Sequence, residues 1–171
     1  MKLTTKGRFA VTAMLDIAMN CASDDSVVPL CDIAKRQNIS NKYLGQILYR
    51  LQQEGLVVGV RGRSGGYRLG RKAELITIDQ IIHAVDENTD TSMCGGDGTC
   101  HGGAKCLTHH LWLDLNSVID DFLSGVTLAA LVQSQHLKHE EKHTAPYVVR
   151  MYRRNQAEET NSNSADEASA G

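Results

Sequence analysis

Long apolar runs are missing from this chain of 171 residues. No stretch approaches the roughly 18–20 apolar residues that a membrane-spanning helix needs, so an integral membrane protein is not expected. The first residues are polar and basic, without an apolar signal core, which argues against secretion. The odd count of five cysteines favours thiols or metal ligands in a reducing cytosol over a disulfide framework. We therefore expect a cytoplasmic protein.

The net charge of −2 hides an uneven distribution along the chain. Residues 1–72 carry 12 lysines and arginines against 5 acidic residues, whereas residues 73–171 carry 6 against 15. A basic N-terminal half suggests contact with a polyanion, although chance surface charge is the simpler alternative. The apolar content of 42% is enough for a packed core, and the length fits one ordinary domain or two small ones.

The first 73 residues have the pattern of three helices followed by a β-hairpin. Apolar residues at helical spacing predict helices at residues 5–20, 30–38 and 41–54. Ser40 is a good N-cap for the third helix. Residues 56–60 and 67–70 are rich in strand formers and flank a glycine-rich turn, which predicts the hairpin. This order indicates a winged helix-turn-helix, so the expected fold is mainly α with a small β-hairpin.

In a helix-turn-helix the N-terminal end of the second helix enters the major groove of DNA. In this chain that recognition helix is the predicted helix at residues 41–54. Its expected outward positions are Asn41, Lys42, Gly45, Gln46 and Tyr49. Asn and Gln can pair with adenine, and Lys can reach guanine or phosphate. The wing arginines Arg61, Arg63 and Arg68 suit a minor groove, and the expected phosphate contacts are Lys2, Lys6 and Arg8. A small helical domain with a solvated basic face is the alternative, but the hairpin and the charge distribution favour DNA binding.

Residues 74–139 are expected to form further helices around a cysteine-bearing loop. Thr77 and Gln80 predict a capping box at the start of one helix. A loop over residues 91–106 precedes a helix over residues 107–123. That helix carries an apolar stripe of Leu111, Leu115, Val118 and Phe122. Another helix is expected from Thr127. Residues 140–171 are predicted to be a largely disordered tail, since the apolar period fades after about His139.

The loop contains the strongest chemical motif, Cys94, Cys100, Cys106 and His109, spaced Cys-x5-Cys-x5-Cys-x2-His. Thiolates and an imidazole converging from a flexible loop favour a soft metal site. Structural zinc usually takes cysteines closer together, whereas an iron–sulphur cluster tolerates wide spacing, and loop glycines let backbone N–H groups approach its sulphurs. Zinc, one disulfide with a free thiol, and ligation by His101 or His110 remain alternatives.

Two further patterns argue against additional chemistry. Cys21 and Cys31 fall on or beside apolar helical faces, so both are expected in the core rather than as ligands. A Cys–His catalytic pair has no evident orienting group or set of oxyanion donors, so an enzyme is not expected.

Several long segments carry a resemblance to a known family. They are residues 1–16, the wing at 60–67, residues 84–87, and Cys106-Leu-Thr-His109 followed by Leu111-Trp112. Over residues 1–135 the chain resembles the IscR-type transcriptional regulators, the cluster-binding branch of a winged-helix repressor family. Such regulators commonly carry an acidic residue where this chain has Gly45.

The resemblance implies a homodimer that controls iron–sulphur cluster assembly genes and senses the cluster itself. One 2Fe–2S cluster per subunit would be held by Cys94, Cys100, Cys106 and His109, with the cluster assembly machinery as donor. By similarity, Ser40, Tyr43, Gln46 and Arg61 would touch DNA.

Pairing of the apolar stripe across a two-fold axis would set two recognition helices about 34 Å apart, matching a pseudo-palindromic operator. Because the cysteine loop abuts the striped helix, gain or loss of a cluster would bias the relative pose of the two wings. Two alternatives remain. One is the same fold with a 4Fe–4S site that senses nitric oxide or redox state, and the other is a cluster carrier that does not bind DNA.

Overall fold

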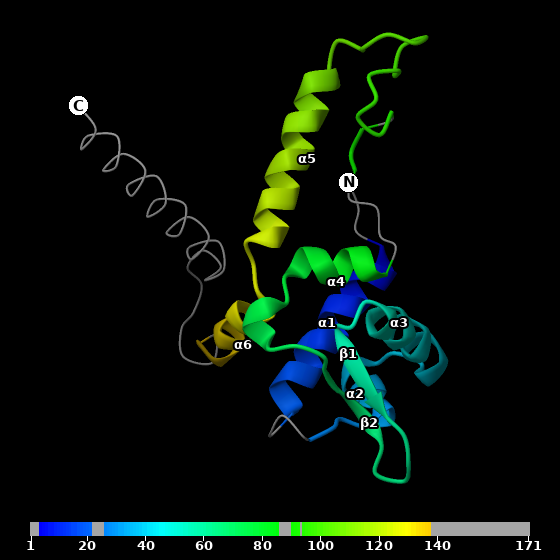
Figure 1. Cartoon of the computed structure of the whole chain (residues 1–171), viewed down its shortest axis with the longest axis vertical. Coiled ribbons are helices and arrows are strands. Elements are labelled where there is room, and N and C mark those ends of the chain that lie inside the picture. The colour runs from blue at the N-terminus through cyan, green and yellow to red at the C-terminus, as the bar shows by residue number, and fades with distance from the viewer. Residues whose placement is uncertain (1–3, 22–25, 86–89, 93, 138–171) are drawn as a thin grey trace, which may run out of the picture.

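The computed structural model describes residues 4–21, 26–85, 90–92 and 94–137 (Figure 1). Lys2 and the predicted tail over residues 140–171 lie outside the described residues. The elements are α1 (Thr5–Asn20), α2 (Leu30–Gln37), α3 (Asn41–Gln53), β1 (Val57–Val60), β2 (Gly66–Leu69), a short 3-10 helix (Ala73–Leu75), α4 (Ile78–Ala84), α5 (His109–Ser124) and α6 (Leu128–Leu137). The expected mainly α fold with one β-hairpin is confirmed, with most element ends within two residues of the predicted ones.

Helix ends show how the local sequence sets these elements. The Ser40 hydroxyl accepts the Tyr43 backbone N–H, as expected for the N-cap of α3. Thr77 and Gln80 form the predicted reciprocal capping box of α4. For α1 the capping side chain is Thr4, which accepts the Lys6 backbone N–H at 3.3 Å. An N-cap hydroxyl satisfies one of the backbone donors that the first helical turn leaves free, which defines where each helix begins.

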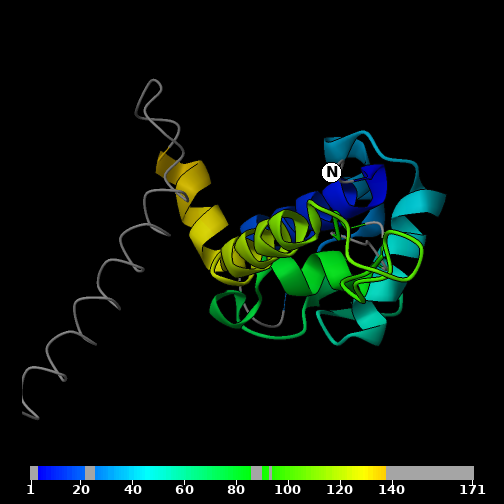
Figure 2. The same ribbon diagram turned by 90° about the horizontal axis from the view of Figure 1, so that it is seen from above.

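One continuous hydrophobic core joins the N-terminal helices to α4 and α6. Met14 and Ile17 of α1 are buried in the same cluster as Leu48 of α3, Ile81 of α4 and Leu128 of α6. Helix α4 lies against α1 in this body (Figure 1), and in the view from above α5 overlaps the body because it points toward the viewer (Figure 2). The segments before α4 and α6 are hydrogen-bonded to each other, with the Leu128 N–H donating to the Ile76 carbonyl at 2.8 Å. Helices α4 and α6 therefore share one hydrophobic core with the helix-turn-helix and do not form a separate domain core.

The wing is an antiparallel pair in which Val57 lies opposite Leu69 and Val60 opposite Gly66. Val28 adds a bridge on the other edge, because its N–H and carbonyl pair with the Tyr67 carbonyl and N–H, both at 2.8 Å. A Cβ on Gly66 would collide with the Val28 carbonyl, so this close approach requires glycine. The segment before α2 thereby anchors the wing beside the helix-turn-helix.

A buried carboxylate fastens α2 to α1. Asp16 is only 4% exposed. It accepts from Arg36 Nη2 at 2.6 Å, Arg36 Nε at 3.0 Å and Gln37 Nε2 at 2.6 Å. The pKa of Arg36 is raised, chiefly by this hydrogen bonding to Asp16. The contact fixes the first helix of the helix-turn-helix against the core.

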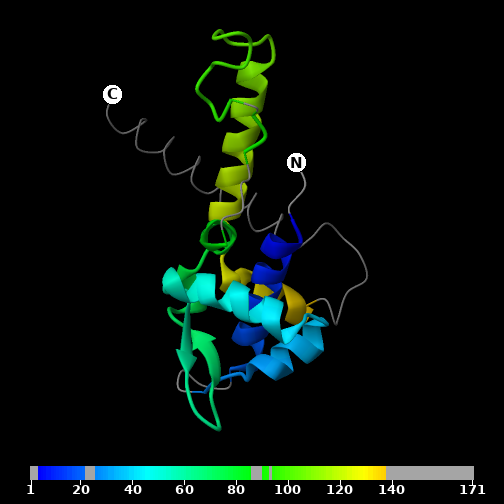
Figure 3. The ribbon, with the colours of Figure 1, turned by 90° about the vertical axis from the view of Figure 1, so that its right-hand side faces the viewer.

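Helix α5 points away from this core and holds the cysteine loop at its far end, opposite the wing (Figures 1 and 3). It begins at His109, two residues later than predicted. Cys21 is half-buried against the core, but Cys31 is exposed, so the prediction of a core position was wrong for Cys31. Cys31 lies in the first turn of α2, whose buried side presents Ile33 and Ala34 instead. In the described part of the chain, no helix has the length and hydropathy needed to cross a bilayer.

Candidate functional site

The recognition-helix surface, defined here as Asn41, Lys42 and Gln46, is the outward face of α3. All three side chains are exposed, while the opposite face buries Leu44 and Ile47. This division follows from helical periodicity, which places core residues and outward residues on separate faces. The amide and ammonium groups are therefore on the solvent side of the helix, where a ligand outside the protein can reach them.

The other residues predicted to contact DNA differ in their surroundings. Ser40 is exposed but uses its hydroxyl as the N-cap of α3. Tyr43 is half-buried, with its ring edge-on to Phe9 at a centroid distance of 6.0 Å. Lys6 is half-buried near the start of α1. The packing of Tyr43 on Phe9 links the position of the recognition helix to the N-terminal end of α1.

Gly45 lies in the interior of α3, and its position does not demand glycine. A Cβ placed there would meet only Leu30 Cδ1, at 3.8 Å, which is an ordinary van der Waals contact. The helix therefore has room for a Cβ at this position.

Arg61 and Arg63 are both exposed in the turn between β1 and β2. Arg68, on β2, is half-buried. Two exposed guanidinium groups at the wing tip place positive charge on a second part of the DNA-binding half, as expected for a further contact with a nucleic-acid backbone or groove.

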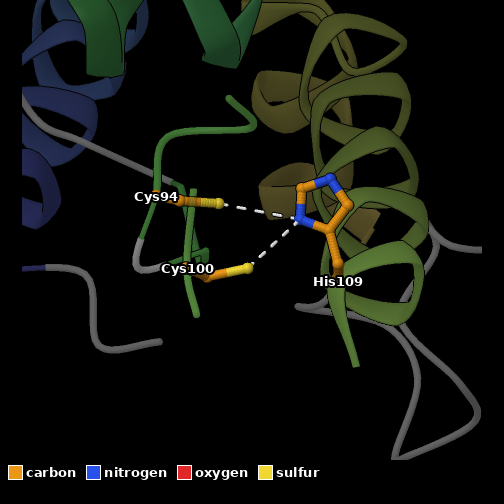
Figure 4. Close-up of side chains that lie close together, drawn as sticks. All are labelled: Cys94, Cys100 and His109. Carbon is orange, nitrogen blue, oxygen red and sulfur yellow. Dashed lines mark hydrogen bonds between the residues drawn. The ribbon is translucent and has the colours of Figure 1, made fainter. Parts of the chain in front are cut away.

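At the other end of the molecule, three predicted ligands converge. Cys94 and Cys100 from the loop face His109 in the first turn of α5 (Figure 4). Their Sγ atoms lie 3.6 Å and 3.7 Å from His109 Nδ1, and all three donor atoms are within 4.8 Å of one another. His109 is 2% exposed. Among the described residues this group is the only one with a possible metal-binding geometry, and it contains neither His101 nor His110.

The third cysteine of the motif, Cys106, lies next to this group but not within it. Its backbone N–H donates to Cys100 Sγ at 3.1 Å, and its own Sγ lies 3.6 Å from Thr108 Oγ1. The Thr108 hydroxyl also accepts the Trp112 indole N–H at 3.1 Å. The ligand pattern in the sequence did not reveal Thr108, although its position two residues after Cys106 is the signal that could have done so.

Backbone groups and neighbouring thiols tune the three sulphurs differently. The pKa of Cys94 is lowered, chiefly by the Gly98 backbone N–H, with further N–H donors from Gly96 and Thr99. The pKa of Cys106 is lowered, first by its hydrogen bond with the Thr108 side chain. For Cys100 the Cys106 N–H lowers the pKa, but the neighbouring sulphurs and desolvation outweigh it and the net direction is upward.

The glycine-rich composition of the loop has a direct structural cause. Gly95, Gly96, Gly98, Gly102 and Gly103 all have positive φ. Only glycine adopts this conformation readily, and it turns successive backbone N–H groups toward one side. The result is a set of N–H donors around Cys94, which stabilises a thiolate. A soft donor set of this kind suits iron or another thiophilic metal.

The apolar stripe of α5 is left largely uncovered. Leu111 is 59% exposed and Val118 is 62% exposed, while Leu115 and Trp112 are each 38% exposed. Phe122, at the other end of the stripe, is half-buried against the core. Exposed apolar patches that follow one helix face usually mark a contact surface.

A winged helix-turn-helix with an outward polar recognition helix and basic wing defines a class of DNA-binding proteins. A family model described as Rrf2, an iron-dependent transcriptional regulator, matches residues 3–134. The chain belongs to the Rrf2 family and is a transcriptional regulator, not an enzyme.

Curated relatives include the HTH-type transcriptional regulator IscR of Cronobacter sakazakii, 50% identical over 149 residues, covering 84% of this chain and 91% of the relative. The regulator of the same name from Vibrio campbellii is 53% identical and covers 80% of each chain. Among solved structures, T. potens IscR has a TM-score of 0.64 and 29% identity, covering 84% of this chain and 94% of that one. CymR, the global cysteine regulator of B. subtilis, has a TM-score of 0.67 and 28% identity, with coverages of 78% and 97%.

Proposed function

We propose that this transcriptional regulator senses the supply of iron–sulphur clusters and controls genes for their assembly. The convergence of Cys94, Cys100 and His109 at the start of α5 carries the proposal. Several relatives at about half identity are named IscR, and the matching family is described as iron-dependent. Cys106, hydrogen-bonded to Cys100, is proposed as the fourth ligand.

The donor chemistry fits an iron–sulphur cluster. Two sulphurs and a buried imidazole nitrogen already point at one place, and N–H groups of the loop surround Cys94. A 2Fe–2S cluster, one per subunit, would supply a redox-active centre whose presence reports cluster supply. An imidazole in place of a fourth thiolate reduces the negative charge of the ligand set. The protein's part is to hold the donors in place and to link them to α5.

Regulation is proposed to pass through α5. His109 begins this helix, and its apolar stripe is available to pair with the same stripe of a second copy. A two-fold dimer would present two recognition helices and two wings to a pseudo-palindromic operator. A change at the ligand end of α5 would then bias how the two DNA-binding ends are held, and a coupling free energy of about 1–3 kcal/mol is enough for regulation.

The first test is the visible spectrum of anaerobically purified protein, with counts of iron and sulphide. We expect coloured protein with about two irons and two sulphides per chain. His109→Ala should shift the spectrum or lose the cluster; no change would favour a 4Fe–4S site without this ligand. Colourless protein with stoichiometric zinc would remove the sensing proposal and leave DNA binding untouched.

The second test compares loaded and cluster-free protein on a palindromic DNA fragment by fluorescence anisotropy. We expect the loaded and cluster-free proteins to differ in their affinity for at least some DNA fragments. Gln46→Ala should weaken specific binding by about 1–3 kcal/mol. Equal binding by both forms to every operator tested would contradict cluster sensing, and wild-type affinity in Gln46→Ala would show that the recognition assignment is wrong.

A further inference from the structure

One side chain of α5 fastens the start of the cysteine loop to the helix. Asn116 Oδ1 accepts the Thr91 backbone N–H at 2.8 Å and the Thr91 hydroxyl at 2.6 Å. Asn116 Nδ2 donates to the Asp90 carboxylate, which also accepts the Ser92 backbone N–H at 2.7 Å. We call these four residues the Asn116 clasp. A single amide thereby engages the beginning of the loop through both its donor and its acceptor.

The clasp lies on the same side of α5 as His109. Residues seven apart share a helix face, and His109, Leu113 and Asn116 have the spacing i, i+4 and i+7. Leu113 packs toward the loop, since its Cδ2 would lie 3.5 Å from a Cβ at Gly96. Asn116 is about 10 Å further along the helix axis than His109, at about 1.5 Å per residue. The exposed apolar stripe occupies a different face.

The loop is therefore held at two places along one helix. Its end is fixed by the start of α5, where the His109 N–H donates to the Cys106 carbonyl at 3.1 Å. Its beginning is fixed by the clasp, a few residues before Cys94. Between them run the five glycines with positive φ, which have no side chains to define the path of the loop.

We propose that Asn116 is a positioning residue for metal binding, which sets the place from which Cys94 reaches His109. The inference rests on the proposed metal binding and deepens it. A donor set that is already in place binds its metal more tightly than one that must be ordered on binding. The reason is that the loop has already lost its conformational entropy when the protein folded, so metal binding does not have to compensate for that loss. Hydrogen-bonding partners outside the ligands commonly change metal affinity by about 10–100-fold when they are replaced.

The amide chemistry of Asn116 supplies a sharp variant. Asn116→Asp keeps the shape and the acceptor for Thr91 but replaces the donor with an oxygen that faces the Asp90 carboxylate. Repulsion between the two carboxylates should open the clasp. In the swap Asp90→Asn with Asn116→Asp, the new amide at position 90 can donate to the new carboxylate, which restores the bond between the two side chains. The Ser92 N–H shares Asp90 Oδ1 with the Asn116 amide and loses that acceptor, so the swap should rescue the effect in part. Ser117→Ala, an exposed neighbour on the same helix, is the matched control.

The experiment uses the full chain and two readouts. Loaded protein is mixed with excess chelator, and the loss of visible absorbance is followed. Cluster-free protein is titrated with cobalt(II) alone, whose thiolate charge-transfer band reports the affinity. We expect Asn116→Asp to lose the cluster about 10-fold faster and to bind cobalt about 10-fold more weakly. The swap should return both values toward wild type, and Ser117→Ala should leave both unchanged.

The outcomes separate this inference from the proposed function. If wild type takes up no iron and sulphide but binds cobalt, the proposed function fails, and the cobalt titration alone decides the role of Asn116. If Asn116→Asp matches wild type in both readouts, or the swap fails to rescue, the positioning role is overturned. Thr91→Val, which keeps the backbone N–H, is a milder variant and carries the test if Asn116→Asp does not fold. Thermal unfolding of each variant identifies that case.

Discussion

At the scale of single residues, the ion pair between Asp16 and Arg36 joins α1 to α2 within the DNA-binding half. Arg36 is half-exposed, with 39% of its side chain accessible, whereas the Asp16 carboxylate is enclosed. We expect Arg36→Ala to lower the free energy of unfolding by about 2–3 kcal/mol, because it leaves a buried carboxylate without its main partner. Urea denaturation measures the effect, with the exposed neighbour Lys35→Ala as control at within about 0.5 kcal/mol. A loss no larger than that of the control would mean that the pair does not stabilise the fold.

Replacing two different glycines by alanine should change the free energy of unfolding in opposite directions. Gly45→Ala should raise the free energy of unfolding by about 1 kcal/mol, since glycine is a poor helix former and a Cβ there meets only Leu30. Gly55 lies just after the C-cap of α3, and its φ of +65° is a backbone conformation in which an L side chain is strained. Gly55→Ala should therefore lower stability by about 1–2 kcal/mol. Thermal unfolding of the two variants side by side tests the pair, and a shift in the same direction for both would contradict this explanation.

At the scale of elements, local patterns were sufficient for most of the fold. The N-caps at Ser40 and Thr77, the apolar faces of α3 and α4, and the hairpin all follow from interactions within a few residues. The exposed position of Cys31 was not predicted, because the short helix α2 has only two buried residues and the period alone does not fix its rotation. The Val28 bridge to Tyr67 joins residues far apart in sequence and has no local pattern.

In the candidate metal site, too, some residues could be predicted from local sequence and others could not. The spacing of Cys94, Cys100 and His109 was enough to nominate them, and the structure brings their donor atoms together. The clasp residue Asn116 was not found, since its partners lie 25 and 26 residues earlier and its role depends on the path of the loop. Its position seven residues after His109 is the only local signal.

The wing is an element whose charge can be tested alone. If Arg61 contacts a phosphate or the minor groove, Arg61→Gln should weaken DNA binding and lower the slope of log affinity against log salt by about 1. Lys105→Gln removes the same charge in the cysteine loop, which lies at the end of the molecule opposite the wing (Figure 1), and should leave the slope unchanged. The measurement is anisotropy at several salt concentrations with cluster-free protein. An equal change in both variants would show a general charge effect rather than a wing contact.

At the scale of the whole molecule, the two functional ends are separated by α5. The recognition helix and wing lie at one end, and the cysteine loop lies at the other (Figures 1 and 3). The face of α5 that carries His109 and Asn116 is occupied by the loop, whereas the stripe face is exposed in a single copy. If the loop face binds a metal as proposed, its effect on DNA binding would have to pass through pairing of the stripe face or through the contact of α5 with the core.

Pairing through the stripe predicts the effect of a charge placed on it. Val118 is 62% exposed, so Val118→Glu should leave the folding of one copy nearly unchanged. In a dimer the same carboxylate would be buried against its symmetry mate, which should yield monomers in sedimentation equilibrium. Affinity for a palindromic fragment should then fall by about 100-fold or more, because the second half-site no longer binds as part of one molecule. Ser117→Glu adds the same charge outside the stripe and should preserve both the dimer and the affinity. Dimeric Val118→Glu with wild-type DNA binding would show that α5 does not form the interface.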